Sequence, residues 1–427
     1  MAERTEEQLA RVLRAAAELA PEPAADLALR VAARRRRRRR RRMQVLLAAT
    51  GVVTVIGTGM TVARGAFRDH PVVVAAGPPV TAAAPATAAG FAPARQVWPD
   101  AVSRIPATAR DGAAYRPVTA LGPAEVLLSA EAPTGRAMRI EAYDTAAGTT
   151  RVLATASAPA GLIRYHVQGW DVDARDIAWY ATAETSRGEP VALFWTVPRA
   201  GGTARLVHTI TGDPAIRVDR IALTGDGRLA YSTTTGGVFT LRLDGAGGPT
   251  RLPGTDGIHL QRWPWAGDRP AGNGIDPGQR LIVNLVTGER RRVRAEAGVR
   301  AMRCGPTWCV GERRGADGLP RAVVQRFDGT QRRELDRLRA YPALDGLVDD
   351  RFAVLSVTGG RAAGAPAAVV HDLRTGATAV VGTTDDDGGT SLARGASSPP
   401  SRVLYWNVTG RSGKQNEYWV LNLAAVR

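Results

Sequence analysis

Two cysteines are the residues of this chain whose spacing points most directly to covalent chemistry. Cys304 and Cys309 enclose the tetrapeptide Gly-Pro-Thr-Trp. Gly305 and Pro306 favour a tight turn, and facing residues of two paired strands lie at Cα separations that a disulfide accepts. We therefore predict a disulfide across a hairpin, formed in an oxidising compartment. A metal site would need more ligands, and a redox-active pair is more often spaced C-x-x-C.

Candidate catalytic groups are sparse elsewhere in the sequence. It contains no G-x-S-x-G, H-E-x-x-H or Walker motif, although a Ser-His-Asp triad stays open because its members need only meet in space. The histidines are scattered at His70, His166, His208, His259 and His371. No catalytic, cofactor-binding or metal-ligating residue is indicated, and we predict a protein without a cofactor that is not an enzyme.

Two further segments have one structural and one functional interpretation each. The residues Asp385, Asp386 and Asp387 form a dense acidic loop that can bind a cation, but a solvated turn between repeats is the simpler explanation. Trp263 and Trp265 flank a proline. We predict that both pack in the core, and the alternative is an aromatic anchor that projects from a loop.

A weak repeat from Trp98 onward supplies the elements that would position any site. Its unit is an apolar strand, a turn with glycine and a second strand with basic residues. The apolar strands lie at 138–143, 191–197, 237–243, 280–285, 322–327 and 367–373, and their turn glycines are 40 to 54 residues apart. A period near 45 residues with four strands per unit is typical of a β-propeller.

One stretch carries a family resemblance. Residues 223–252 read LTGDGRLAYSTTTGGVFTLRLDGAGGPTRL and resemble one blade of the TolB-like, WD-repeat-like propellers. Asp226-Gly227 and 229–231 match the first turn and strand of the family repeat, and 244–248 with 251–252 match the second. The family's proline before this Asp-Gly is glycine here. The resemblance implies a propeller over 98–427, and it is specific in this one blade.

The number of blades follows from the strands at the two ends of the repeat region. Six hairpins are complete, and a final strand at 417–423 lacks an outer partner. Residues 101–105 alternate as a strand does, and pairing them with the final strand removes an open sheet edge. We predict an all-β, seven-bladed propeller closed by the N-terminal strand. Six or eight blades also fit, because 263–276 is poor in strand signal.

An apolar segment beside a run of arginines predicts a membrane anchor. Residues 45–63 carry no charge, and a helix of that length spans about 28 Å. The unbroken arginine run 34–42 precedes it, which keeps the N-terminus cytoplasmic and exports the C-terminal domain. Arg34, Arg38 and Arg42 are expected to lie on anionic headgroups. A cleaved signal peptide, a buried core helix and a nucleic-acid patch are the alternatives, but 44 residues precede the apolar stretch.

The residues before the anchor predict a short helical head. Leu9, Val12, Leu13 and Ala16 recur at helical spacing and form one apolar face. This face fits a groove on a cytosolic partner, the membrane surface or a second copy. The head loosely resembles membrane regulators of alternative sigma factors from actinobacteria, although it lacks their zinc-binding His and Cys set. The resulting domains are 1–44 (head), 45–63 (anchor), 64–97 (Pro/Ala-rich linker) and 98–427 (propeller).

Composition narrows the class of function. The formal net charge is +17, but aromatic residues make up only 5% of the chain, and we expect no nucleic-acid partner. Lys414 is the only lysine, which with the many Ala and Gly residues favours an actinomycete-like source. We predict a single-pass, extracytoplasmic propeller that binds a protein or glycan. The alternatives are an anti-sigma-like regulator that signals through its head, and a hydrolase or lyase of envelope polymers.

Overall fold

The computed structural model describes the C-terminal part of the chain. The described residues are 90–131, 137–213, 215–268, 278–335, 340–342, 347–357, 366–383, 392–408 and 416–427. The chain divides into two compact units, Met1–Val80 and Thr81–Arg427, and everything described below belongs to the second. The predicted head, anchor and most of the linker lie outside the described residues, as does the acidic loop 385–387. Within the described ranges, no helix has the length and apolar character needed to cross a bilayer.

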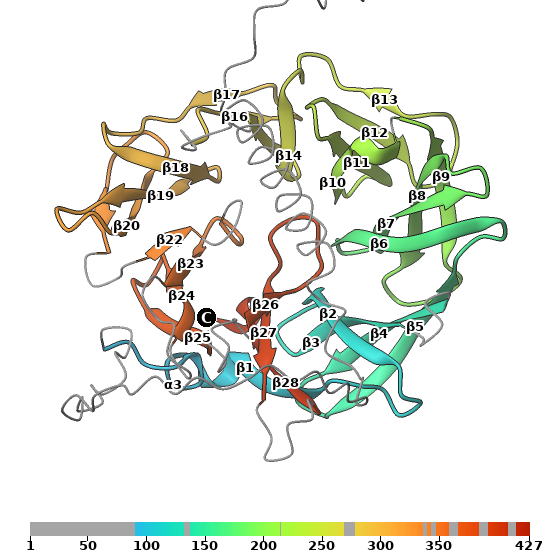
Figure 1. Ribbon diagram of the computed structural model, residues 1–427, viewed down its shortest axis with the longest axis horizontal. Coiled ribbons are helices and arrows are strands. Elements are labelled where there is room, and N and C mark those ends of the chain that lie inside the picture. The colour runs from blue at the N-terminus through green and yellow to red at the C-terminus, as the bar shows by residue number, and fades with distance from the viewer. Residues whose placement is uncertain are drawn as a thin grey trace, which may run out of the picture. The chain divides into compact units, whose positions relative to one another are not determined.

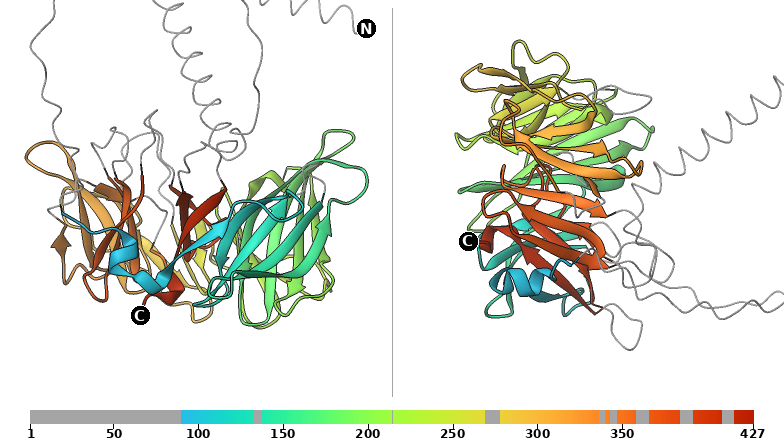
Figure 2. Two further views of the ribbon diagram at one scale, coloured as in Figure 1. Left: turned by 90° about the horizontal axis from the view of Figure 1, so that it is seen from below. Right: turned by 90° about the vertical axis from the view of Figure 1, so that its left-hand side faces the viewer.

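Seven four-stranded antiparallel sheets form a ring of blades (Figure 1). Figure 2 shows the same blades from two directions at right angles to this view. In each blade the strands pair in succession, so that the first strand lies nearest the ring axis and the fourth lies at the rim (Figure 1). The prediction of a seven-bladed, all-β propeller is confirmed. Turns with glycine or aspartate join the strands at close to the predicted period, because each blade is one meander of four short strands.

The first four blades have well-defined strand bounds. Blade 1 contains β2 (Ala114–Ala120), β3 (Glu125–Glu131), β4 (Ala137–Asp144) and β5 (Thr149–Ser157). Blade 2 contains β6 (Leu162–Val172), β7 (Asp176–Thr185), β8 (Pro190–Pro198) and β9 (Arg205–Thr211). Blade 3 contains β10 (Val218–Leu223), β11 (Arg228–Thr233), β12 (Val238–Arg242) and β13 (Thr250–Arg251). Blade 4 contains β14 (Ile258–Arg262), β15 (Trp265–Asp268), β16 (Leu281–Asn284) and β17 (Arg290–Arg292).

The remaining three blades and four short helices complete the described part of the chain. Blade 5 contains β18 (Val299–Cys304), β19 (Trp308–Arg314), β20 (Pro320–Arg326) and β21 (Arg333–Glu334). Blade 6 contains β22 (Ala340–Pro342), β23 (Phe352–Val357), β24 (Pro366–Asp372) and β25 (Thr378–Thr383). Blade 7 contains β26 (Leu392–Arg394), β27 (Val403–Asn407), β28 (Glu417–Asn422) and β1 (Val102–Pro106). The helices are α3 (Ala94–Val97), η1 (Pro99–Ala101), η2 (Ala215–Arg217) and η3 (Leu423–Ala425).

The ring closes through a strand from its N-terminal end. The strand β1 pairs antiparallel with β28, with Ile105 opposite Tyr418. Ile105 is 1% exposed and packs between blades 7 and 1. The predicted closure is confirmed, and it leaves blade 7 with the same four strands as the other blades.

The core lies between adjacent blades. The strand β8 is apolar along nearly its whole length, because neighbouring blades cover both faces of its sheet and remove the usual alternation of apolar and polar residues. In blade 2, Trp179 stacks on Trp195 with ring centroids 5.9 Å apart. Trp263 packs against the apolar cluster between blades 3 and 4, and Trp265 packs against the one between blades 4 and 5, which confirms the packing interpretation for both residues.

Candidate functional site at the ring axis

The topology gathers one set of turns at one end of the ring. All blades share one strand order, so their first strands run in the same direction along the axis. The turns that lead from each first strand to the second strand therefore lie together at one end, which we call the turn end. Charged residues at these turns can meet across the ring, even when their blades are not neighbours.

Four charged side chains at the turn end come from four different blades, and we call them the axial charge cluster. They are Asp171 at the end of β6, Arg262 at the end of β14, Asp349 in the turn after β22, and Arg402 just before β27. Asp349 forms ion pairs with Arg262 and with Arg402, the latter at 2.7 Å. Blades 4 and 6 are separated by blade 5, so the Arg262–Asp349 pair reaches across the ring near its axis.

The turn that carries Asp349 is held in an uncommon backbone conformation. Asp349 and Asp350 have φ values of 54° and 53°, a region that costs energy for residues other than glycine and that asparagine and aspartate tolerate best. The carboxylate of Asp350 accepts a hydrogen bond from the backbone N–H of Trp308 in blade 5, at 3.0 Å. The two consecutive aspartates therefore point to different blades, and backbone conformations of this kind are concentrated at functional sites.

Asp171 is the member of the cluster with the most perturbed ionisation. Its carboxylate accepts a 2.6 Å hydrogen bond from the backbone N–H of Leu223 in blade 3. Burial raises the pKa of Asp171 from 3.8 to about 6, and the N–H groups of Leu223 and Val172 and the charge of Arg262 only partly oppose it. Loss of hydration lowers the pKa of Arg262 and Arg402, but arginine remains charged under all ordinary conditions.

A segment of blade 7 lies beside the cluster at the centre of the ring. Residues 395–402 link β26 to β27 and reach towards blade 2 in Figure 1. The backbone N–H of Ser398 donates to the Trp170 carbonyl at 2.6 Å, and its hydroxyl accepts from the Ile221 N–H at 2.8 Å. Gly395 is needed at its position, because a Cβ there would collide with the Val118 carbonyl oxygen. This segment, which we call the axial segment, thus joins blade 7 to blades 1, 2 and 3.

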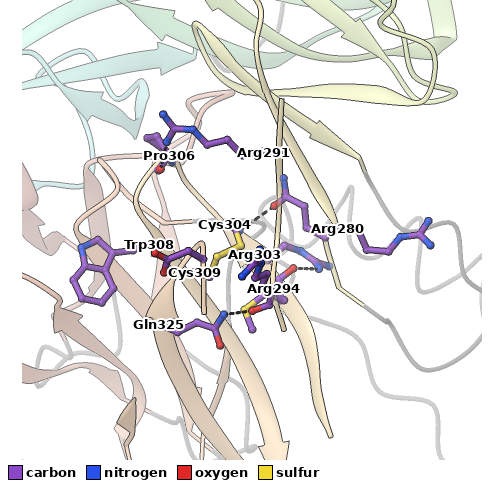
Figure 3. Close-up of a disulfide and its surroundings, with 12 residues drawn as sticks. Arg280, Arg291, Arg294, Arg303, Cys304, Pro306, Trp308, Cys309 and Gln325 are labelled. Carbon is purple, nitrogen blue, oxygen red and sulfur yellow. Dashed lines mark hydrogen bonds between the residues drawn. A yellow bond between two sulfur atoms is a disulfide. The ribbon is translucent and has the colours of Figure 1, made fainter. Parts of the chain in front are cut away.

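The predicted disulfide is present (Figure 3). It spans the turn from the first to the second strand of blade 5, which belongs to the turn end. Cys304 and Cys309 face each other across the β18–β19 hairpin with a Cα separation of 4.0 Å, and both are buried. The backbone N–H of Cys304 donates to the buried Gln279 side chain at 2.9 Å. The turn of the hairpin is fixed from blade 4, because Arg291 donates to the Pro306 carbonyl at 2.8 Å (Figure 3).

The other polar pairs in the described ranges belong to the frame of the ring. His259 lies 3.3 Å from Asp219 on the neighbouring first strand, and His371 lies 2.8 Å from Thr378 within blade 6. Burial lowers the pKa of His371. In the part of the chain that the structure describes, no group of three or more His, Cys, Asp or Glu residues is arranged to hold a metal ion.

The predicted and the observed sites overlap only at the disulfide. The apolar face of the head (Leu9, Val12, Leu13 and Ala16) and the basic run with Arg34, Arg38 and Arg42 lie outside the described residues, so they remain predictions. The axial charge cluster was not predicted. Asp171 and Arg262 lie at the ends of first strands, whereas Asp349 and Arg402 lie in the links that lead to second strands, and nothing in the local sequence joins the four.

Comparison with known proteins finds distant structural similarities. No family model matches the sequence, and no curated protein matches it. Among solved structures, the β-propeller domain of the Trilobed protease from Pyrococcus furiosus is similar over 70% of this chain and 91% of that chain, with 7% identity and a TM-score of 0.42. An uncharacterized protein of Listeria monocytogenes is similar over 68% and 88%, with 10% identity and a TM-score of 0.41. TolB from Acinetobacter baumannii is similar over 66% and 76%, with 13% identity and a TM-score of 0.33. A shared fold does not carry a shared activity.

Proposed function

We propose that this chain is a non-catalytic binding module, a propeller exported from the cell and held at the membrane by residues 45–63. The observation that carries the proposal is the axial charge cluster. Four blades contribute one charged side chain each, and Asp349 is kept in a costly turn conformation to reach its two arginines. A ring that needed only stability would gain more from apolar packing at this place.

The chemistry of the cluster favours binding over catalysis. A guanidinium has N–H donors and no acceptor, and it does not act as a base at ordinary pH. The carboxylate of Asp349 is already neutralised by Arg262 and Arg402. Such groups recognise and orient a ligand, but they do not supply a nucleophile.

One observation favours a second candidate, a hydrolase or lyase of envelope polymers. The pKa of Asp171 is about 6, near the pH at which a carboxyl exchanges protons most effectively. This candidate predicts that purified full-length protein releases soluble products from envelope polymer and that Asp171→Asn abolishes the release. The binding module predicts no release by either protein.

The disulfide supports the exported location. Disulfides persist in oxidising compartments and are rare in the cytosol, and Cys304 and Cys309 are bonded here. The test is to quench cells with acid, block free thiols and then measure the redox state of the two cysteines. An oxidised pair in a chain whose C-terminal unit is digested by protease in spheroplasts supports export. A reduced, protected pair contradicts it.

Binding itself is tested by co-sedimentation of the detergent-solubilised full chain with insoluble envelope material. We expect retention that falls at least tenfold in the Arg262→Gln/Arg402→Gln variant. The matched control is Arg175→Gln, which removes an exposed arginine from the turn after β6. Equal retention of all three proteins, or retention of none, would reject the axial cluster as the binding site.

A further inference from the structure

The two arginines of the axial charge cluster offer more donors than Asp349 can use. Each guanidinium carries five N–H groups, whereas a carboxylate has about four acceptor sites. The side chain of Arg262 is 45% exposed and that of Arg402 is 37% exposed, while that of Asp349 is 23% exposed. Solvent therefore reaches the arginines more readily than it reaches the aspartate that they hold.

The charge around the axis is positive as well. The seven first strands together carry seven arginines and two aspartates. Two of the arginines form ion pairs with glutamates of the adjacent second strands, which leaves a net charge of +3. Within the cluster itself, the two arginines balance Asp349 and Asp171 when both carboxyl groups are ionised. Burial raises the pKa of Asp171 to about 6, so below that pH its carboxyl is neutral and one unit of positive charge remains. An excess of one sign of charge around the axis concentrates ions of the opposite sign along it.

We propose that Arg262 and Arg402 form a binding site for a carboxylate group of a ligand, which lies on their solvent side next to Asp349. The inference rests on the proposed function and names the chemistry that the binding module recognises. A planar carboxylate matches the two parallel N–H groups of a guanidinium. In the same site the Asp349 carboxylate already contacts one nitrogen of each arginine. While the carboxyl of Asp171 is protonated, one added negative charge leaves the axial charge cluster and the ligand neutral as a group.

The experiment is calorimetric titration of the full chain with succinate, in uncharged detergent micelles at about pH 5, where Asp171 is mostly protonated. Succinamide is the neutral probe of nearly the same shape, and inorganic phosphate is the second anion. We expect succinate to bind at least tenfold more tightly than succinamide and more tightly than phosphate. Phosphate binding as tight as that of succinate would overturn the carboxylate assignment, and so would equal binding of succinate and succinamide.

Four variants locate the site. Arg262→Gln and Arg402→Gln are each expected to weaken succinate binding at least tenfold, whereas the control Arg175→Gln changes it less than twofold. Asp349→Asn keeps a side chain that tolerates the turn and removes the internal carboxylate, so it is expected to tighten succinate binding several-fold. Tighter binding cannot arise from misfolding. The Asp349→Asn result therefore tests the carboxylate site even if either arginine variant unfolds.

The outcome separates this inference from the proposed function. If a folded Asp349→Asn variant binds succinate more weakly, or if Arg402→Gln behaves as Arg175→Gln does, the carboxylate site is wrong. If the wild-type chain is nevertheless retained on envelope material, the proposed binding function stands and only the carboxylate ligand is rejected. If the chain neither binds succinate at this site nor is retained on envelope material, both proposals are rejected.

Discussion

Removing the disulfide has an effect whose size follows from the loop that it closes. Cys304 and Cys309 are five positions apart, so the bond closes a loop of about six residues. The chain-entropy relation gives about 7 cal/mol/K for such a loop, or about 2 kcal/mol at 25 °C. Unfolding entropy is about 2.1 cal/mol/K per residue, and the unit Thr81–Arg427 has roughly 350 residues. A loss of about 2 kcal/mol therefore lowers its Tm by about 3 °C.

The assay is urea unfolding of the wild-type chain and of Cys304→Ala/Cys309→Ala, each with and without a phosphine reductant. We expect the reductant to lower the free energy of unfolding of the wild type by about 2 kcal/mol and to leave the variant unchanged. The variant should lie somewhat below the reduced wild type, because both side chains are buried and alanine leaves small voids. If reduction frees both thiols and the midpoint does not move, the entropic argument is refuted.

Three further predictions concern the frame that holds the site. Burial raises the pKa of Asp171 from 3.8 to about 6, so stability should fall by about 2 kcal/mol as the pH rises from about 4 to about 6. Asp171→Asn should remove this contribution from the pH dependence of unfolding. Arg351 forms an ion pair at 2.7 Å with the fully buried carboxylate of Asp372. Arg351→Met should lower the free energy of unfolding in urea by about 3 to 5 kcal/mol, and adding Asp372→Asn should restore part of that stability. Ile105→Ala should cost about 3 kcal/mol by the same assay, whereas Ile163→Ala, at a side chain that is 47% exposed, should cost less than about 1 kcal/mol.

The architecture was predictable because each blade repeats the same local signals. The six predicted apolar strands correspond to β4, β8, β12, β16, β20 and β24, the third strands of blades 1 to 6. Their apolar runs and turn glycines are local properties of the sequence. The weak signal at 263–276 corresponds to β15, which has only four residues. The fourth strands are the least visible in the sequence, because strands such as β13 contain only two residues.

The closing strand could be predicted by combining its local sequence pattern with a general physical rule. Residues 101–105 carry an alternating pattern that many strands share, and this pattern alone does not identify the strand with which they pair. The unpaired strand at the C-terminal end supplied the partner, because an exposed edge is costly. The register of Ile105 opposite Tyr418 came only from the structure. The disulfide was predictable for the same reason, since its two cysteines lie in one hairpin.

The axial charge cluster lies beyond this kind of reasoning, because its members are far apart in the chain. Asp171 and Arg402 are brought to one place only when seven blades close a ring, and their distance depends on the blade number and the tilt of each blade. In the sequence, Arg262 precedes Trp263 and is one of many arginines, and Asp349 is indistinguishable from other turn aspartates. What distinguishes Asp349 is its φ of 54° together with its two arginine partners. The site is therefore a property of the closed ring, and a perturbation that opens the ring at β1 should remove ligand binding together with the cluster.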